Sequence, residues 1–375
     1  MGQSKFVRRA DIKENDEIVA AGQFIDKVYQ PDMAGVVFFC SSEYNLDKLA
    51  QVFNERLSCP VIGCTTAGEI GSHYQTGSIV GASFSSDVFK FHVEVIQPLA
   101  EFSMEESHNL AEKLQASLVY SESLNDKNMV GFLLVDGLSV LEEKITAYLY
   151  RGMQGTPIIG GSAGDNLKFI ETKVYANGQF MSDAAIFTLI ETKLPFTTFK
   201  LQHFVPSDLD LVVTNADPDK RIVHEIDGGL AGEEYAHMLN LEPDDLCDEV
   251  FATNPLMLQI GEDWFVRSIQ VMNSNGSLRF ASAIDNGLPL TIGRSIGLVK
   301  SLEKKIEELE NEFVDIEFTL GCDCILRRFE IVEKNLMNDV ENLLKRINFV
   351  GFSSFGEQYN ALHVNQTLTG VVFGR

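Results

Sequence analysis

Three segments of this 375-residue chain follow one pattern, and that repetition constrains the fold more than any other feature. Each segment has an apolar run typical of a buried strand, a helical pattern, a second short apolar run, and a turn of the form G-x₃₋₄-G-[ED]. Glycines in such a turn allow positive φ angles and close backbone approach. We therefore predict three strand–helix–strand–turn units whose turns, at 63–69, 160–165 and 351–357, share a backbone shape.

The turns have two interpretations. They are either ordinary tight turns, or they surround one ligand pocket with backbone N–H groups and small hydroxyls. The second interpretation gives five candidate pocket residues, which are Cys64, Thr65, Ser162, Ser353 and Glu357.

The remaining sequence supplies further strands and helices. Residues 89–95 alternate with period two, as in a strand with His92 facing solvent, and Asn177-Gly178 predicts a hairpin joining 173–180 to 184–190. Residues 296–313 are amphipathic. The fold class is mixed α/β, with two lobes of mixed sheets covered by helices. The predicted domains are an N-terminal arm (1–32), a first lobe (33–220) and a second lobe (221–375).

Charge and cysteine content exclude several classes of partner. The 54 acidic and 30 basic residues give a net charge of −24, which disfavours nucleic acid and anionic membrane surfaces. No apolar run approaches the roughly 18 residues of a membrane span, and no secretory signal follows the first ten residues. Six sparse cysteines without a C-x-x-C pair indicate free thiols. We expect a cytoplasmic protein.

One catalytic motif is present in outline. Gly160-Gly-Ser-Ala-Gly164 matches the G-x-S-x-G nucleophile elbow of α/β-hydrolases. That elbow needs a helix directly after the serine, whereas residues 165–171 have a strand-like pattern. A serine hydrolase using Ser162 is therefore the least favoured alternative, and we expect no enzymatic activity.

Three stretches resemble the FIST family of bacterial sensory proteins, which have FIST N and FIST C lobes. They are 61–69 (VIGCTTAGE), 225–228 (EIDG) and 351–369, and the resemblance extends from about residue 33 to the end. It implies a sensor of a small ligand. No signalling module is fused in this sequence, so the resemblance implies an output that acts on a partner in trans.

Residues 323–328 and 356–367 further resemble NosP, the haem-binding, nitric-oxide-sensing branch of the family. This resemblance implies haem b, nitric oxide as the signal, and a histidine kinase of a two-component system or a cyclic-di-GMP enzyme as the partner. It also makes His363 the expected axial ligand of the haem iron, with His237 and His224 as alternatives. Asn365 shares the face of His363 on a predicted strand and is expected to hydrogen-bond nearby.

The two arginines of the same region are further cofactor-binding candidates. Strand alternation after Cys324 would place Arg327 and Arg328 on opposite faces, so one should be partly buried and need an anion. Glu330, Glu357 or a haem propionate could supply it. The main alternative is a FIST sensor of a small metabolite such as an amino acid, without haem. A homo-oligomer stays open in either case.

Overall fold

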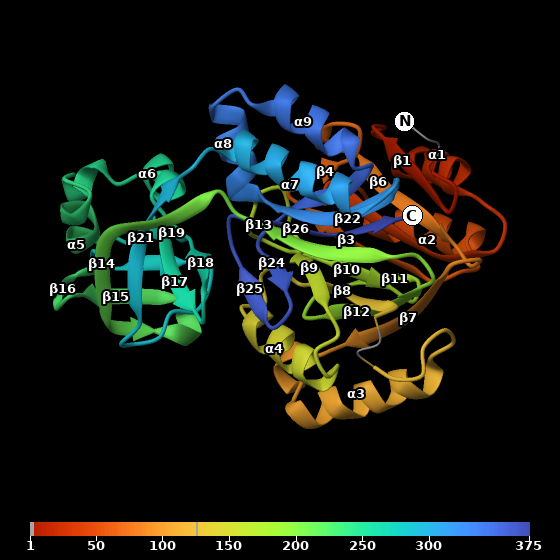
Figure 1. Ribbon diagram of the computed structural model, residues 1–375, viewed down its shortest axis with the longest axis horizontal. Coiled ribbons are helices and arrows are strands. Elements are labelled where there is room, and N and C mark those ends of the chain that lie inside the picture. The colour runs from red at the N-terminus through yellow and green to blue at the C-terminus, as the bar shows by residue number, and fades with distance from the viewer. Residues whose placement is uncertain (1–3, 125–126) are drawn as a thin grey trace. The chain divides into compact units, whose positions relative to one another are not determined.

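The computed structural model describes residues 4–124 and 127–375, and its contacts divide them into two compact units. Unit 1 comprises the described residues within 1–201, 302–362 and 368–375, and unit 2 comprises residues 202–301 and 363–367. The predicted fold class is confirmed, because mixed sheets are covered by helices (Figure 1). The units do not follow the predicted domains, since the predicted arm and most of residues 302–375 belong to unit 1.

Unit 1 contains three copies of one larger repeat. Each copy adds a strand and a helix before the predicted unit, and a hairpin and a strand after it. The first copy consists of β1 (Val7–Ile12), α1 (Glu17–Val28), β2 (Met33–Ser41), α2 (Leu46–Arg56), β3 (Val61–Thr66), β4 (Glu69–Ile70), β5 (Tyr74–Gln75) and β6 (Ile79–Ser85). Its first two elements account for the predicted arm.

The second copy keeps this order. It consists of β7 (Phe89–Ile96), α3 (Met104–Ser117), β8 (Met129–Val135), α4 (Glu142–Gly152), β9 (Ile158–Ser162), β10 (Val174–Ala176), β11 (Gln179–Met181) and β12 (Ala185–Thr192). The Asn177-Gly178 hairpin joins β10 to β11. The predicted pairing of 173–180 with 184–190 is wrong, because β12 pairs instead with β7 and β8.

The third copy is interrupted after its first strand by residues of unit 2. It consists of β13 (Phe196–Leu201), α7 (Leu298–Glu312), β22 (Ile316–Cys324), α8 (Ile325–Glu333), α9 (Met337–Arg346), β23 (Phe349–Ser354), β24 (Glu357–Tyr359), β25 (Leu362–Val364) and β26 (Leu368–Gly374). Two helices, α8 and α9, replace the single helix between the parallel strands of the other copies.

The three copies exchange their hairpins in a cycle. At the centre of each six-stranded sheet is a parallel pair from one copy: β2–β3, β8–β9 or β22–β23. The sheet orders are β1-β6-β2-β3-β10-β11, β7-β12-β8-β9-β24-β25 and β13-β26-β22-β23-β4-β5. Each hairpin after a turn therefore completes the sheet of another copy, which ties the three copies together.

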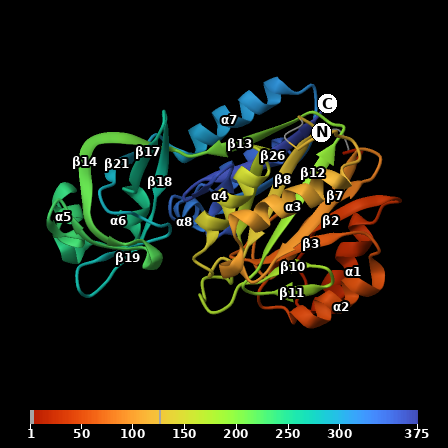
Figure 2. The same ribbon diagram turned by 90° about the horizontal axis from the view of Figure 1, so that it is seen from below.

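Buried apolar side chains from all three copies form one core. Phe39 of β2 stacks on Phe352 of β23, with ring centroids 4.6 Å apart, and also contacts Phe132 of β8. Helices α1 and α2 pack on the first sheet, and α3 and α4 on the second (Figure 2). Side chains cap the starts of two of these helices by hydrogen bonds: Asp16 caps α1, and Ser103 with Glu106 forms a capping box at α3.

Unit 2 has a separate sheet, of order β18-β17-β21-β14-β15-β20-β19. Its elements are β14 (Phe204–Asp217), β15 (Ile222–Ile226), β16 (Gly229–Leu230), α5 (Ala231–Met238), α6 (Asp248–Thr253), β17 (Leu256–Ile260), β18 (Asp263–Arg267), β19 (Ile269–Met272), β20 (Leu278–Phe280) and β21 (Pro289–Ser295). None of the helices in the described part of the chain has the length and apolarity to cross a lipid bilayer.

Candidate functional site

The three repeat turns meet at one place in unit 1 and hydrogen-bond to one another. This junction brings together the five predicted pocket residues, although they lie up to about 300 positions apart in the sequence. The cross-turn bonds are Ala67 N–H to Ser353 O (3.0 Å), Ser353 N–H to Gly68 O (2.7 Å), Gly164 N–H to Thr65 O (3.0 Å), Asn166 N–H to Thr66 O (3.0 Å), Ser162 N–H to Gly356 O (2.8 Å) and Phe355 N–H to Ser162 O (3.1 Å).

The first and third turns are near copies. Gly68 and Gly356 have φ angles of +141° and +153°, a region that favours glycine. In each turn, the residue two positions before this glycine donates its hydroxyl to the acid that follows the glycine. Thr66 donates to Glu69 at 2.5 Å, and Ser354 donates to Glu357 at 2.6 Å. The expected common shape thus holds for these two turns.

The second turn departs from that shape, so the prediction for all three is wrong. Its acid, Asp165, accepts backbone N–H groups of residues 169–171 at 2.6 to 3.1 Å. These bonds hold a loop in which Asn166, Leu167 and Phe169 all have positive φ angles near +50 to +65°. Leu167 and Phe169 each cost roughly 1–2 kcal/mol relative to a right-handed conformation, whereas asparagine adopts the left-handed region more readily. A strained loop, anchored by one carboxylate, therefore borders the junction.

The five predicted pocket residues lie inside the junction and are buried. Thr65 exchanges hydrogen bonds with the backbone of Lys173, and Ser162 accepts the Gln358 amide at 3.0 Å. Burial raises the pKa of the Cys64 thiol well above its ordinary value. The Ser353 hydroxyl has no hydrogen-bond partner among the described residues. The turns mostly bond to each other, and none of these five residues lines the pocket that opens beside them.

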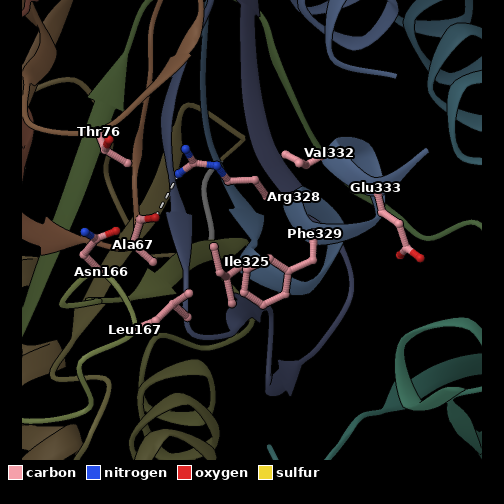
Figure 3. A pocket seen from close by; sticks show the side chains of 9 residues that line it. All are labelled: Ala67, Thr76, Asn166, Leu167, Ile325, Arg328, Phe329, Val332 and Glu333. Atoms are coloured by element: carbon pink, nitrogen blue, oxygen red, sulfur yellow. Dashed lines mark hydrogen bonds between the residues drawn. The ribbon is translucent and has the colours of Figure 1, made fainter. Parts of the chain in front are cut away.

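That pocket has a volume of about 420 Å³, within the roughly 300–1,000 Å³ usual for small-ligand sites. All three copies contribute to it (Figure 3). The first copy gives Ala67 and Thr76, the second gives Asn166 and Leu167, and α8 of the third gives Ile325, Arg328, Phe329, Val332 and Glu333. Most of this lining is apolar, and Arg328 is its one cation.

Arg328 is positioned by the first turn. Its Nη1 donates to the Ala67 carbonyl at 2.9 Å, and a Cβ added to Gly68 would lie 1.6 Å from the same nitrogen. The absence of a side chain at Gly68 is thus what lets the guanidinium approach. Burial lowers the pKa of Arg328 below its ordinary value, while the nearby Glu69 partly offsets this effect.

The expectation that Arg327 and Arg328 lie on a strand is wrong, because they belong to α8. Arg327 is fully buried and donates from Nε to Asp323 at 2.6 Å, an anion that the sequence did not predict. Burial opposes its charge, but Asp323 and Tyr74 keep its pKa above the ordinary value. Tyr74, on the exchanged strand β5, donates to the other Asp323 oxygen at 2.5 Å. This group joins the first and third copies.

Glu69 ends the first turn and begins β4, the first strand of the exchanged hairpin. Its carboxylate accepts the hydroxyls of Thr66 and Ser78 and the Ser78 N–H. Burial raises the pKa of Glu69 to about 7, against the lowering effect of these bonds and of Arg328. The carboxylate is therefore satisfied by hydroxyls and does not form a direct ion pair with the arginine.

Of the predicted haem residues, His363 and Asn365 do not line this pocket and belong to the 363–367 segment of unit 2. His363 is 2% exposed, and Arg267 Nη1 lies 3.5 Å from its carbonyl oxygen. Asn365 is fully buried, and neither of its amide atoms has a hydrogen-bond partner among the described residues. No group of three or more His, Cys, Asp or Glu side chains within the described ranges could hold a metal ion.

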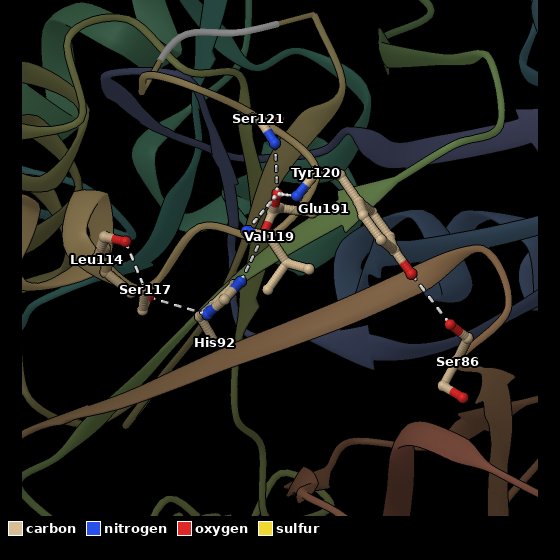
Figure 4. Close-up of polar contacts among 8 residues, drawn as sticks. All are labelled: Ser86, His92, Leu114, Ser117, Val119, Tyr120, Ser121 and Glu191. Carbon is tan, nitrogen blue, oxygen red and sulfur yellow. Dashed lines mark hydrogen bonds and ion pairs between the residues drawn. The ribbon is translucent and has the colours of Figure 1, made fainter.

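Two arrangements resemble hydrolytic sites. At the first, β9 ends at Ser162 and no helix follows before β10, so the nucleophile elbow is not formed. At the second, His92 lies 3.0 Å from Ser117 Oγ and 2.7 Å from Glu191 (Figure 4). The expectation that His92 faces solvent is wrong, since its side chain is 12% exposed.

The arrangement at Glu191 fastens a loop. The N–H groups of 119–121, which could otherwise stabilise an oxyanion, already bind Glu191, and Ser117 donates to the Leu114 carbonyl at 2.8 Å. Burial alone would raise the pKa of Glu191, but the backbone N–H groups and His92 hold it below its ordinary value. Its carboxylate ties the segment after α3 to β12.

Comparison with known proteins identifies the family of the chain. A FIST N domain matches residues 34–229, more than half of the chain, and a FIST C domain matches residues 231–360. An uncharacterized protein of Methanocaldococcus jannaschii is 26% identical over 385 aligned residues, covering 91% of this chain and 73% of that relative. The chain therefore belongs to the FIST family, whose domains are sensor domains that bind small ligands.

Proposed function

We propose that this chain is a sensor that binds a small ligand in the pocket beside α8 and regulates a partner signalling protein in trans. The observation that carries the proposal is that all three repeats contribute to the pocket. A ligand bound there contacts the first turn, the strained loop of the second copy and α8 of the third copy. Binding can therefore change how the three copies pack, which is a physical route to a partner surface.

The partner class follows from the family resemblance, which favours a histidine kinase or a cyclic-di-GMP enzyme. Its test is direct. Purified chain, with and without ligand, is added to such an enzyme, and phosphorylation or cyclic-di-GMP turnover is measured. A ligand-dependent change supports the proposal, and equal rates in all conditions contradict it.

A bulky side chain placed in the pocket tests whether the ligand binds there. Leu167, 37% exposed in the pocket lining, is replaced by Trp, and Leu209, 39% exposed in unit 2, is replaced by Trp as the control. A ligand at 100 times its Kd stabilises the folded state by about 2.7 kcal/mol. In a thermal-shift screen of small metabolites, a ligand of the pocket raises the Tm of wild type and Leu209→Trp but not of Leu167→Trp. Equal shifts in all three proteins place the ligand elsewhere.

A second candidate is haem-based nitric oxide sensing, with His363 as the axial ligand of haem b. The unsatisfied amide of Asn365, two residues after the buried His363, favours a polar ligand group at this segment, because a buried amide without a partner costs roughly 1–3 kcal/mol. When bound, haem would supply an iron coordination position for the gas. His363 would hold the iron, and Asn365 would hydrogen-bond close to it.

The arginines do not support the haem candidate. Arg327 is engaged by Asp323, and Arg328 lines the pocket beside α8. Haemin titration of wild type and His363→Ala, followed by visible absorption, tests this candidate. Stoichiometric binding with a Soret band that shifts in the variant supports it; no binding by wild type contradicts it, and an unchanged band in the variant assigns the iron to another residue.

A further inference from the structure

The charge of Arg328 is not neutralised by a direct partner. No carboxylate lies within 4 Å of its guanidinium in the described part of the chain, whereas Arg327 one residue earlier has Asp323 at 2.6 Å. Glu69, whose charge acts on Arg328, already accepts the hydroxyls of Thr66 and Ser78. A partly buried guanidinium has donors suited to a planar anion, and one of its five N–H groups is used by Ala67.

The rest of the pocket is suited to an apolar group. Leu167, Ile325, Phe329 and Val332 form its wall, and Phe329 and Val332 are 40% and 55% exposed. Covering such side chains gains roughly 25 cal/mol per Å² of apolar surface. Only Thr76 and Asn166 add neutral polar groups. The lining thus combines one cationic end with an apolar wall.

Local charge favours a monoanion over a dianion. The single Arg328 has Glu333 in the same lining and Glu69 close behind the turn. A second negative charge on the ligand would meet these acids without another cation to balance it. Inorganic phosphate and dicarboxylates are disfavoured on the same ground.

We propose that the pocket beside α8 binds a small carboxylate with an apolar body, whose carboxylate is held by Arg328 and whose body lies on Leu167, Phe329 and Val332. This inference rests on the proposed function, because it specifies the ligand class of the same pocket. The apolar wall and the guanidinium then recognise the two parts of one molecule.

The test uses hexanoate as probe, with hexan-1-ol, hexylamine and phosphate as comparison ligands, and isothermal titration of the full chain. Hexanoate should bind wild type more tightly than the three others. Arg328→Met should weaken hexanoate binding by about 10- to 100-fold, the loss expected for charge-assisted hydrogen bonds. Arg328→Lys should lose less, and Arg294→Met, at an exposed arginine of unit 2, should match wild type. Thermal unfolding shows that each variant is folded.

The outcomes test the proposed carboxylate ligand and the proposed pocket separately. If hexan-1-ol binds as tightly as hexanoate, and Leu167→Trp abolishes both, the pocket is confirmed and the carboxylate is wrong. Tighter binding of hexylamine or phosphate also overturns the carboxylate. If none of the four probes binds wild type, this inference fails, and the metabolite screen with Leu167→Trp still decides the proposed function on its own.

Discussion

Helix α8 has two faces with opposite roles, and adjacent arginines mark them. Arg327 is fully buried, paired with Asp323, and joins the third copy to the hairpin of the first. Arg328 lines the pocket, bonds a backbone carbonyl, and has no carboxylate within 4 Å among the described residues. An arginine thus stabilises the fold at position 327, where the fold supplies a carboxylate. At position 328, where the fold supplies none within 4 Å among the described residues, the guanidinium is available to a ligand.

The inward face gives the largest expected effect. Arg327→Met removes the cation from Asp323 and leaves a buried carboxylate without its ion pair, which costs about 3–5 kcal/mol. Arg328→Met, one residue on, should change the free energy of unfolding by less than about 1 kcal/mol. Urea denaturation measures both. Equal losses in the two variants would abolish the distinction between the faces.

A pH experiment probes the carboxyl group behind the pocket face. The pKa of Glu69 is about 7 in the folded chain, which is above its value in the unfolded chain. At a pH between these two values, folding is therefore accompanied by uptake of a proton at Glu69. The stability gained is fully present below the unfolded pKa and is lost as pH rises through 7, by about 3 kcal/mol at most. The free energy of unfolding of wild type should therefore fall, relative to Glu69→Gln, between pH 5 and 8. Parallel profiles would be inconsistent with a raised pKa.

The glycine at position 68 lets the Arg328 guanidinium approach the first turn. Gly68→Ala places an L side chain at φ +141°, costing roughly 1–3 kcal/mol, and its Cβ would displace Arg328. Gly77→Ala is the control, because Gly77 also has positive φ (+69°) but has open space around it. We expect Gly68→Ala to weaken ligand binding and Gly77→Ala to leave it unchanged. Unaltered ligand affinity in Gly68→Ala would show that the guanidinium position does not matter.

The smallest effect is expected at Ser162. Ser162→Ala removes the acceptor of the Gln358 amide and should cost about 1 kcal/mol. Ligand affinity and partner regulation should stay within a few fold of wild type, because Ser162 is buried outside the pocket lining. Assays with p-nitrophenyl acetate check the alternative. Loss of an esterase activity in this variant would reinstate the serine as a nucleophile.

Repetition in the sequence predicted much of unit 1. The first strands of the three units, near residues 35, 130 and 318, lie where their apolar runs placed them, and the turns after the second strands meet. The helical nature of 325–333 was also accessible, because in the first two copies a helix follows the equivalent strand. Treating Arg327 and Arg328 as an extension of the β22 pattern missed that signal.

Other features could not be predicted from the sequence. The exchanged strands are only two or three residues long, so they have no periodicity, and their partners lie in another copy. The pocket is lined by Ala67, Asn166 and α8, which neighbour the glycine-rich turns in space but carry no motif. Asp323 gains its importance only when the fold buries it with Arg327.

A ligand that binds at the pocket face of α8 should protect the backbone around the pocket from exchange with solvent. Hydrogen–deuterium exchange of wild type with and without saturating hexanoate tests it most directly. We expect slower exchange in 165–172 and 325–333 of wild type, no such change in Arg328→Met, and little change in 363–367. Protection confined to 363–367, or equal protection in Arg328→Met, would contradict it.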